Sequence, residues 1–128
     1  MSYLIVFLGA GAGGALRHGT NVLGARLLGT DFPYATLTVN IVGSFAMAVL
    51  VEIFAFKTGL SQSMRLFLTT GLLGGYTTFS SFSLDAMSLF DRHQWTLGIV
   101  YVLLSVLGGL AAFVAGMVLM RAVLGSGV

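Results

Sequence analysis

The residues best suited to chemistry in this sequence lie close together in its third apolar segment. Gly74-Gly75-Tyr76-Thr77-Thr78 places glycines and hydroxyl residues inside an otherwise apolar run. Such a stretch interrupts a helix, and in hydrocarbon the carbonyl oxygens that lose their helical donors need an ion, water or other protein groups. Carbonyl oxygens at a break are ligands for hard cations. The alternative is a glycine kink healed by the two threonines, and both interpretations stay open on these residues alone.

Two aromatic side chains follow directly. Phe79 and Phe82, in Phe-Ser-Ser-Phe-Ser, are three residues apart and so share one face of a helix. Two rings on one face are usually packed in a core. The alternative is that their edges face a pore, because the edge of an aromatic ring is the positive part of its quadrupole and can hold a small anion.

Polar side chains in two other apolar segments carry a similar ambiguity. Asn40 shares a helical stripe with Gly43 and Met47, and its amide either bonds a neighbouring helix or contacts a ligand. Tyr101 and Ser105 lie one turn apart in the last apolar segment and offer two hydroxyl groups. The residue types alone do not separate packing from ligand contact.

Two charged residues interrupt apolar sequence. Arg17 is costly in lipid wherever it lies, so it must pair or reach water, and an intramembrane charge is a candidate functional residue. Asp85 is the only acidic residue between Glu52 and Asp91, and it either pairs with Arg17 or lines an aqueous mouth. Structural pairing is the simpler expectation for both.

The elements that position these residues must be membrane-spanning helices. The chain is 57% apolar and 8% charged, whereas soluble domains carry about 25% charge, and its mean hydropathy is +1.00. Its 128 residues accommodate four spans of about 20 residues with short connections. We therefore expect a single-domain, all-α membrane protein of four transmembrane helices, the third broken near mid-membrane at 74–78. The expected spans are 3–28, 34–56, 64–90 and 95–120.

Several function classes lack their residues. The sequence has no cysteine, no phosphate-binding glycine loop and no HExxH motif, and His18 and His93 lie in different segments. The net charge of +2 comes from a few scattered arginines and Lys57 and indicates no nucleic-acid partner. The N-terminal segment has no basic leader and is expected to be the first span, not a signal peptide. We do not expect an enzyme.

The loop charges hardly favour one orientation in the membrane. In a four-span chain Lys57, Arg65 and Arg121 lie on one side and Arg26 and Arg92 on the other. Orientation normally follows a clear excess of Lys and Arg in cytoplasmic loops. The chain can therefore insert both ways and form an antiparallel two-fold dimer, unless Arg17 or another component fixes one orientation.

Small-residue stripes are typical of close helix association in lipid. Gly9 and Gly13 form a GxxxG pair, and a second stripe in the last segment consists of Ser105, Gly109, Ala112 and Gly116. Either stripe serves packing between two chains or within one.

The segment Gly71-Leu72-Leu73-Gly74-Gly75-Tyr76-Thr77-Thr78-Phe79-Ser80-Ser81-Phe82-Ser83 resembles the signature of the Fluc/CrcB family of fluoride channels. The similarity extends to Thr36-Leu37-Thr38-Val39-Asn40 and Gly13-Gly14-Ala15-Leu16-Arg17. Together with the four-span length, it covers essentially the whole chain.

The resemblance implies a multi-pass channel of the inner (plasma) membrane that exports fluoride passively through two pores of an antiparallel, dual-topology homodimer. The pathway residues that it implies are Asn40, Thr78, Phe79, Phe82, Tyr101 and Ser105. It also implies a sodium ion at the dimer centre, held by the backbone carbonyls of Gly74 and Thr77. Two positions depart from the family pattern: Gly109 stands where a third hydroxyl often follows, and Ser81 where threonine is common.

Two other functions remain as alternatives. A proton-coupled small multidrug exporter has a similar size and topology, but it needs a membrane carboxylate in its first span, and here the nearest candidate, Glu52, lies near the end of the second. A structural subunit of a larger complex would show no transport by itself.

Overall fold

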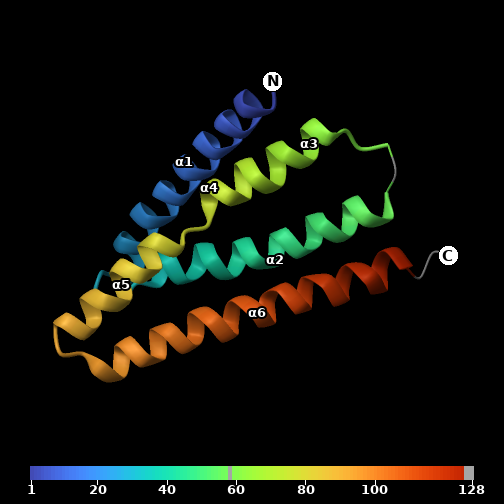
Figure 1. Ribbon diagram of the computed structural model, residues 1–128. Helices are drawn as coiled ribbons and strands as arrows, with labels where there is room; N and C mark the ends of the chain where they lie inside the picture. Colours follow the sequence, from blue (N-terminus) through green and yellow to red (C-terminus); the bar gives the residue numbers. More distant parts are fainter. Residues whose placement is uncertain (58, 126–128) are drawn as a thin grey trace.

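The computed structural model describes residues 1–57 and 59–125, and over these residues the chain forms helices and no strands (Figure 1). The prediction of an all-α protein is therefore confirmed. The elements in chain order are α1 (Ser2–Leu28), α2 (Tyr34–Phe56), α3 (Gln62–Leu66), the π-helical η1 (Phe67–Leu73), α4 (Gly74–Tyr76), α5 (Phe79–Asp91) and α6 (Trp95–Gly125).

Two helices among the described residues are long and apolar enough, by length and composition, to cross a membrane. They are α2 and α6, with mean hydropathies of 2.1 and 2.4 over their most apolar windows. The first helix is longer than α2, but it carries Arg17, His18, Asn21 and Arg26, which lower its hydropathy. Figure 1 shows α2 and α6 lying side by side along their lengths.

The α2–α6 pair is held by small residues and by one ion pair. A Cβ added to the buried Gly116 of α6 would lie 2.8 Å from the carbonyl oxygen of Phe45 on α2, so the two backbones can approach only because this position is glycine. Near the ends of the same helices, the Arg121 guanidinium lies 3.0 Å from the Glu52 carboxylate. The small-residue stripe of α6 thus serves packing within the chain at Gly116.

Helix α1 packs in the same way against the arm formed by α3, η1 and α4. Gly9 and Gly13 are its buried residues. A Cβ added to Gly9 would lie 2.7 Å from the Phe67 carbonyl oxygen, and one added to Gly75 of α4 would lie 2.8 Å from the Ala10 Cα. The GxxxG pair is therefore used within one chain, where it holds in place the arm that leads to the functional residues.

Between α4 and α5 the backbone leaves the helical conformation. Thr77 has φ −81° and ψ 157°, and Thr78 has φ −155° and ψ 118°, both extended. Gly74, Gly75 and Tyr76 are helical, so the non-helical stretch is shorter than the expected 74–78. Gly75 stays helical where it contacts α1, whereas the Thr78 N–H and carbonyl bond to the Asn40 side chain instead of continuing the helix.

Candidate functional site

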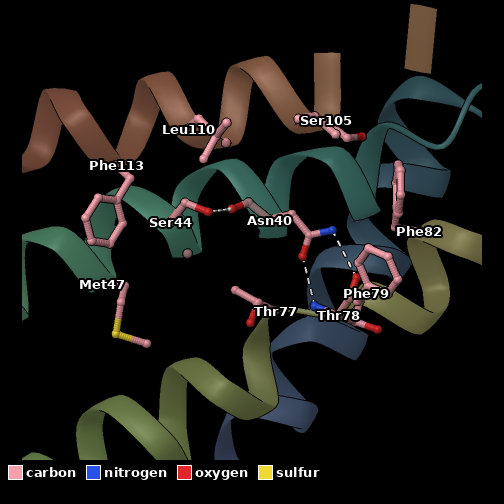
Figure 2. A pocket seen from close by; sticks show the side chains of 13 residues that line it. Asn40, Ser44, Met47, Thr77, Thr78, Phe79, Phe82, Ser105, Leu110 and Phe113 are labelled. Carbon is pink, nitrogen blue, oxygen red and sulfur yellow. Dashed lines mark hydrogen bonds between the residues drawn. The ribbon is translucent and has the colours of Figure 1, made fainter. Parts of the chain in front are cut away.

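A cavity of about 480 Å³ lies between α2, the extended stretch at Thr77 and Thr78, and α6 (Figure 2). Its size falls in the usual range of ligand sites, about 300–1,000 Å³. The lining residues are Asn40, Gly43, Ser44, Met47, Thr77, Thr78, Phe79, Phe82, Ser105, Val106, Gly109, Leu110 and Phe113. The structure thus brings together five of the expected fluoride-pathway residues and Thr77, which come from three separate parts of the sequence.

Asn40 joins α2 to the extended stretch through both ends of its side-chain amide. Its Nδ2 donates to the Thr78 carbonyl oxygen at 3.1 Å, and the Thr78 N–H donates to Asn40 Oδ1 at 2.8 Å (Figure 2). The interhelical hydrogen bond, one of the two sequence-based interpretations, is therefore present. An amide nitrogen carries two donors, and no other described residue accepts from Asn40 Nδ2. One donor is left for a ligand.

The same bonds leave two backbone carbonyls without donors. Thr78 N–H, the helical donor for the Gly74 carbonyl, goes to Asn40 instead, and Ser81 N–H donates to Thr78 Oγ1 at 3.1 Å instead of to the Thr77 carbonyl. No described residue donates a hydrogen bond to the carbonyl oxygen of Gly74 or of Thr77. Gly74 is exposed and Thr77 is half-buried, so both carbonyl oxygens remain open to water or to a hard cation.

The extended stretch also separates two helix ends of opposite partial charge. Helix α5 starts at Phe79 with Thr78 as its cap, and its first N–H groups point toward the stretch. Helix α4 ends at Tyr76 with its carbonyls facing the same region. A helix N-terminus attracts anions and a C-terminus attracts cations. The local backbone therefore provides a suitable place for each.

A row of aromatic rings extends from the cavity into the core. The ring centroids of Phe79 and Phe82 are 5.5 Å apart, those of Phe82 and Tyr101 5.4 Å, and those of Tyr101 and Phe32 5.6 Å. Tyr101 is fully buried, whereas Phe79 is 79% exposed. The row is thus packed at its inner end and uncovered at its outer end.

Tyr101 and Ser105 have different surroundings although they lie one turn apart. The Tyr101 hydroxyl does not line the cavity and donates to Asp85 Oδ2 at 3.2 Å. The Ser105 hydroxyl oxygen does line the cavity, and it is buried with no hydrogen-bond partner among the described residues. Because only Ser105 lines the cavity, it is the member of this pair that a ligand in the cavity can contact.

Asp85 and Arg17 do not pair with each other. Asp85 accepts from Tyr101 and lines a second cavity of about 300 Å³, which also includes Asn21, Ser81 and Arg92. Arg17 is half-buried on α1, lines neither cavity and has no hydrogen bond or ion pair within the described part of the chain. Of the two alternatives for Asp85, the single chain has the one in which the residue lines a cavity, and Tyr101 rather than Arg17 is the neighbour that donates to it.

Several lining residues were not expected from the sequence. Ser44 follows Asn40 by four residues, so its position on the same helical face was a signal that could have identified it. Val106, Leu110 and Phe113 are apolar residues in an apolar helix, and nothing in their type distinguishes a cavity wall from a lipid-facing surface. Gly74 lies outside the cavity lining.

Comparison with known proteins gives one consistent result. A family model described as CrcB-like protein, Camphor Resistance (CrcB), matches residues 4–117. The chain is 52% identical over 123 residues to a protein of Rhodopseudomonas palustris named fluoride-specific ion channel FluC, covering 96% of this chain and 99% of that protein. Proteins of the same name from a Methylobacterium species and from Granulibacter bethesdensis are 50% and 49% identical over 121 residues, covering 94% of this chain and 97% and 95% of their own lengths.

Proposed function

The chain belongs to the CrcB family, and on that premise we propose that it is a fluoride-selective ion channel, a membrane protein through which fluoride leaves the cytoplasm down its gradient. It is a channel and not an enzyme. The observation that carries the proposal is a cavity lined by two donors without partners among the described residues: the buried Ser105 hydroxyl and the second N–H of Asn40. Such a cavity favours a small anion.

The rings of Phe79 and Phe82 complete the anion contacts in this proposal. A pore must replace the water around an ion with contacts that are favourable enough for binding and weak enough for release. Ring edges provide a partial positive charge without a full cation that would trap the anion. No arginine or lysine is among the described residues that line the cavity. Amide, hydroxyl and ring-edge contacts therefore suit conduction of fluoride better than tight storage.

We further propose that two chains associate in antiparallel orientation in the inner membrane. Each chain then has four spans: α1, α2, the arm of α3, η1 and α4 continued by α5 after the extended stretch, and α6. The exposed ring of Phe79 supports this proposal, since a pore-lining side chain that is 79% exposed needs another surface to cover it. The nearly even loop charges support insertion in both orientations. The dimer then has two fluoride pathways.

A sodium ion at the centre of this dimer is the third part of the proposal. The carbonyl oxygens of Gly74 and Thr77 fit it, because both lack donors within the described chain and oxygen atoms suit hard cations. Once bound, sodium would compensate the negative ends of the two α4 helices and hold the extended stretches together.

The alternative of a proton-coupled multidrug exporter gains no support from the carboxylates. Glu52 is buried and paired with Arg121 at 3.0 Å, and it lines neither cavity. A buried, paired carboxylate near a helix end is poorly placed to exchange protons for a cationic substrate.

Fluoride efflux from liposomes tests the proposed function. We expect liposomes containing the purified chain to release fluoride, measured with a fluoride electrode, and to retain chloride. Phe82→Ile keeps an apolar side chain but removes the ring edge, so it should slow fluoride efflux by about tenfold or more. Efflux by Phe82→Ile at the wild-type rate would refute the ring assignment, and no efflux by the wild type would refute the channel.

A further inference from the structure

We infer that Ser44 is an additional anion-contacting residue. Its hydroxyl donates to fluoride at the level of Gly109, where α6 has no side chain to contribute. This inference rests on the proposed function. The residue lies on α2, one turn after Asn40, and lines the same cavity (Figure 2). Its role differs from that of Asn40, because it makes no bond to the extended stretch at Thr77 and Thr78.

The position opposite Ser44 on α6 is Gly109. A Cβ added to Gly109 would lie 3.6 Å from Ser44 Oγ, an ordinary van der Waals contact. Both residues line the cavity. The Ser44 hydroxyl therefore borders the space that the missing Gly109 side chain leaves open, one helical turn beyond Ser105.

Beyond Ser44 the cavity wall becomes apolar. Figure 2 shows Met47 and Phe113 at the end away from Phe79 and Phe82, with Ser44 between Asn40 and Met47. A strongly hydrated anion that gives up water must meet a donor at each step. Among the described lining residues, Ser44 is the last hydroxyl in this direction, so it is the group that can accompany the anion there.

The Ser44 proton is available for this purpose. In the structure Ser44 Oγ donates to the Asn40 carbonyl oxygen at 2.7 Å. That carbonyl is also the helical acceptor for the Ser44 N–H, so it keeps a partner when the hydroxyl rotates away. A hydrogen bond to an anion is stronger than one to a neutral carbonyl. Arrival of fluoride should therefore turn the hydroxyl from the carbonyl to the anion.

A matched pair of variants separates the hydroxyl from the shape of the side chain. Ser44→Thr and Ser44→Val introduce the same branched shape, but only the first keeps a hydroxyl. We expect Ser44→Thr to conduct fluoride within about twofold of the wild type and Ser44→Val to be slower by about tenfold, the effect of one lost hydrogen bond to a charged group. Equal fluoride efflux rates for the two variants would overturn the inference.

A second comparison moves the hydroxyl across the cavity. Ser44→Ala should slow efflux, and adding Gly109→Ser should restore most of the rate, because it places a hydroxyl in the same space from α6. The control is Ser44→Ala with Gly109→Ala, which adds the Cβ alone and should remain slow. A rescue by both double variants, or by neither, would overturn the inference. If all variants and the wild type fail to conduct fluoride, the proposed function fails as well.

Discussion

At the scale of a single residue, Asn40 connects the backbone N–H and carbonyl of Thr78 with the candidate ligand cavity. Its carboxamide occupies the N–H and the C=O of Thr78, which otherwise would lack helical partners. The amide is suited to this because it carries an acceptor and two donors on one rigid plane. The same side chain therefore keeps the extended stretch in place and presents its remaining N–H to the cavity.

This dual role gives a prediction for Asn40→Asp. The acid keeps an oxygen for the Thr78 N–H, but it loses the donor and places a negative charge against a carbonyl oxygen and beside the anion pathway. We expect fluoride efflux to fall by at least about a hundredfold, since the variant loses a donor and gains like-charge repulsion.

The control for this measurement is Thr38→Val, two residues away. Thr38 is exposed and lines neither cavity, and among the described residues its hydroxyl bonds only to the Tyr34 carbonyl of its own helix. It should conduct fluoride like the wild type. An Asn40→Asp protein that conducts at the wild-type rate would show that the anion does not pass Asn40.

At the scale of elements, glycine decides which helices meet. The close approach of α1 to η1 and α4 depends on positions where a side chain would meet backbone atoms, and backbone cannot move aside as a flexible side chain can. The arm that ends at Thr77 is thereby held against α1, while Gly43 allows α2 to approach Thr77 from the other side. Correct placement of the cavity therefore depends on glycines of α1 that lie outside its lining as well as on Gly43, which lines it.

Neighbouring glycines of α1 provide a matched test of this packing. A Cβ at Gly13 would lie 2.8 Å from the Tyr76 N, whereas one at Gly14 would meet nothing within 4 Å. Gly13→Ala should lower stability by about 1–3 kcal/mol through overpacking. Gly14→Ala should be neutral or slightly stabilising, because alanine favours the helix by up to about 1 kcal/mol.

Thermal unfolding of the two variants in detergent, followed by the loss of monodisperse protein, measures the difference. Equal midpoints for Gly13→Ala and Gly14→Ala would mean that α1 does not contact η1 and α4 as closely as the structure has it. A loss of stability in Gly14→Ala alone would instead place the sensitive face of α1 on the opposite side.

At the scale of the whole molecule, the single chain has a cavity open on one side and an exposed pore residue. Exposed apolar side chains are expected on a lipid-facing surface, but Phe79 belongs to the ring row of the proposed pathway. Lipid on this ring would leave the cavity open to hydrocarbon, where an anion is not solvated. This is the reason for proposing a second chain as the surface that covers Phe79.

Dual insertion can be tested cleanly because the sequence contains no cysteine. A single Thr30→Cys substitution places one thiol in the exposed connection between α1 and α2. If the chain inserts in both orientations, about half of the thiols in intact cells should react with a membrane-impermeant maleimide, since the loop charges hardly favour one side.

The complementary measurement is the fraction labelled after the membrane is permeabilised, which should approach completion. Additional lysines in the same connection should change the fraction labelled in intact cells from about half toward none, because they favour a cytoplasmic location of this connection. Labelling of all or none of the wild-type thiols in intact cells would contradict dual insertion and favour a fixed orientation.

The sequence by itself determined the all-helical character of the protein, since few charged residues and long apolar runs leave helices as the structure that satisfies its own backbone in lipid. It also identified five of the thirteen cavity residues, because Asn40, Thr78, Phe79, Phe82 and Ser105 are conspicuous as polar groups or paired rings in apolar surroundings. Residue type and spacing of this kind indicate which contacts a side chain can make, but not which partner it contacts.

Only the tertiary structure decided which partners these residues have. Asn40 bonds Thr78 across 38 positions of sequence, Asp85 meets Tyr101 instead of Arg17, and Gly9 and Gly13 pack against their own chain. For each of these residues, two different partners were compatible with the residue type and its position in the sequence. The choice followed from how closely the helices pack, because hydrogen bonds and backbone contacts form only within a few ångströms and those separations are set by the fold as a whole.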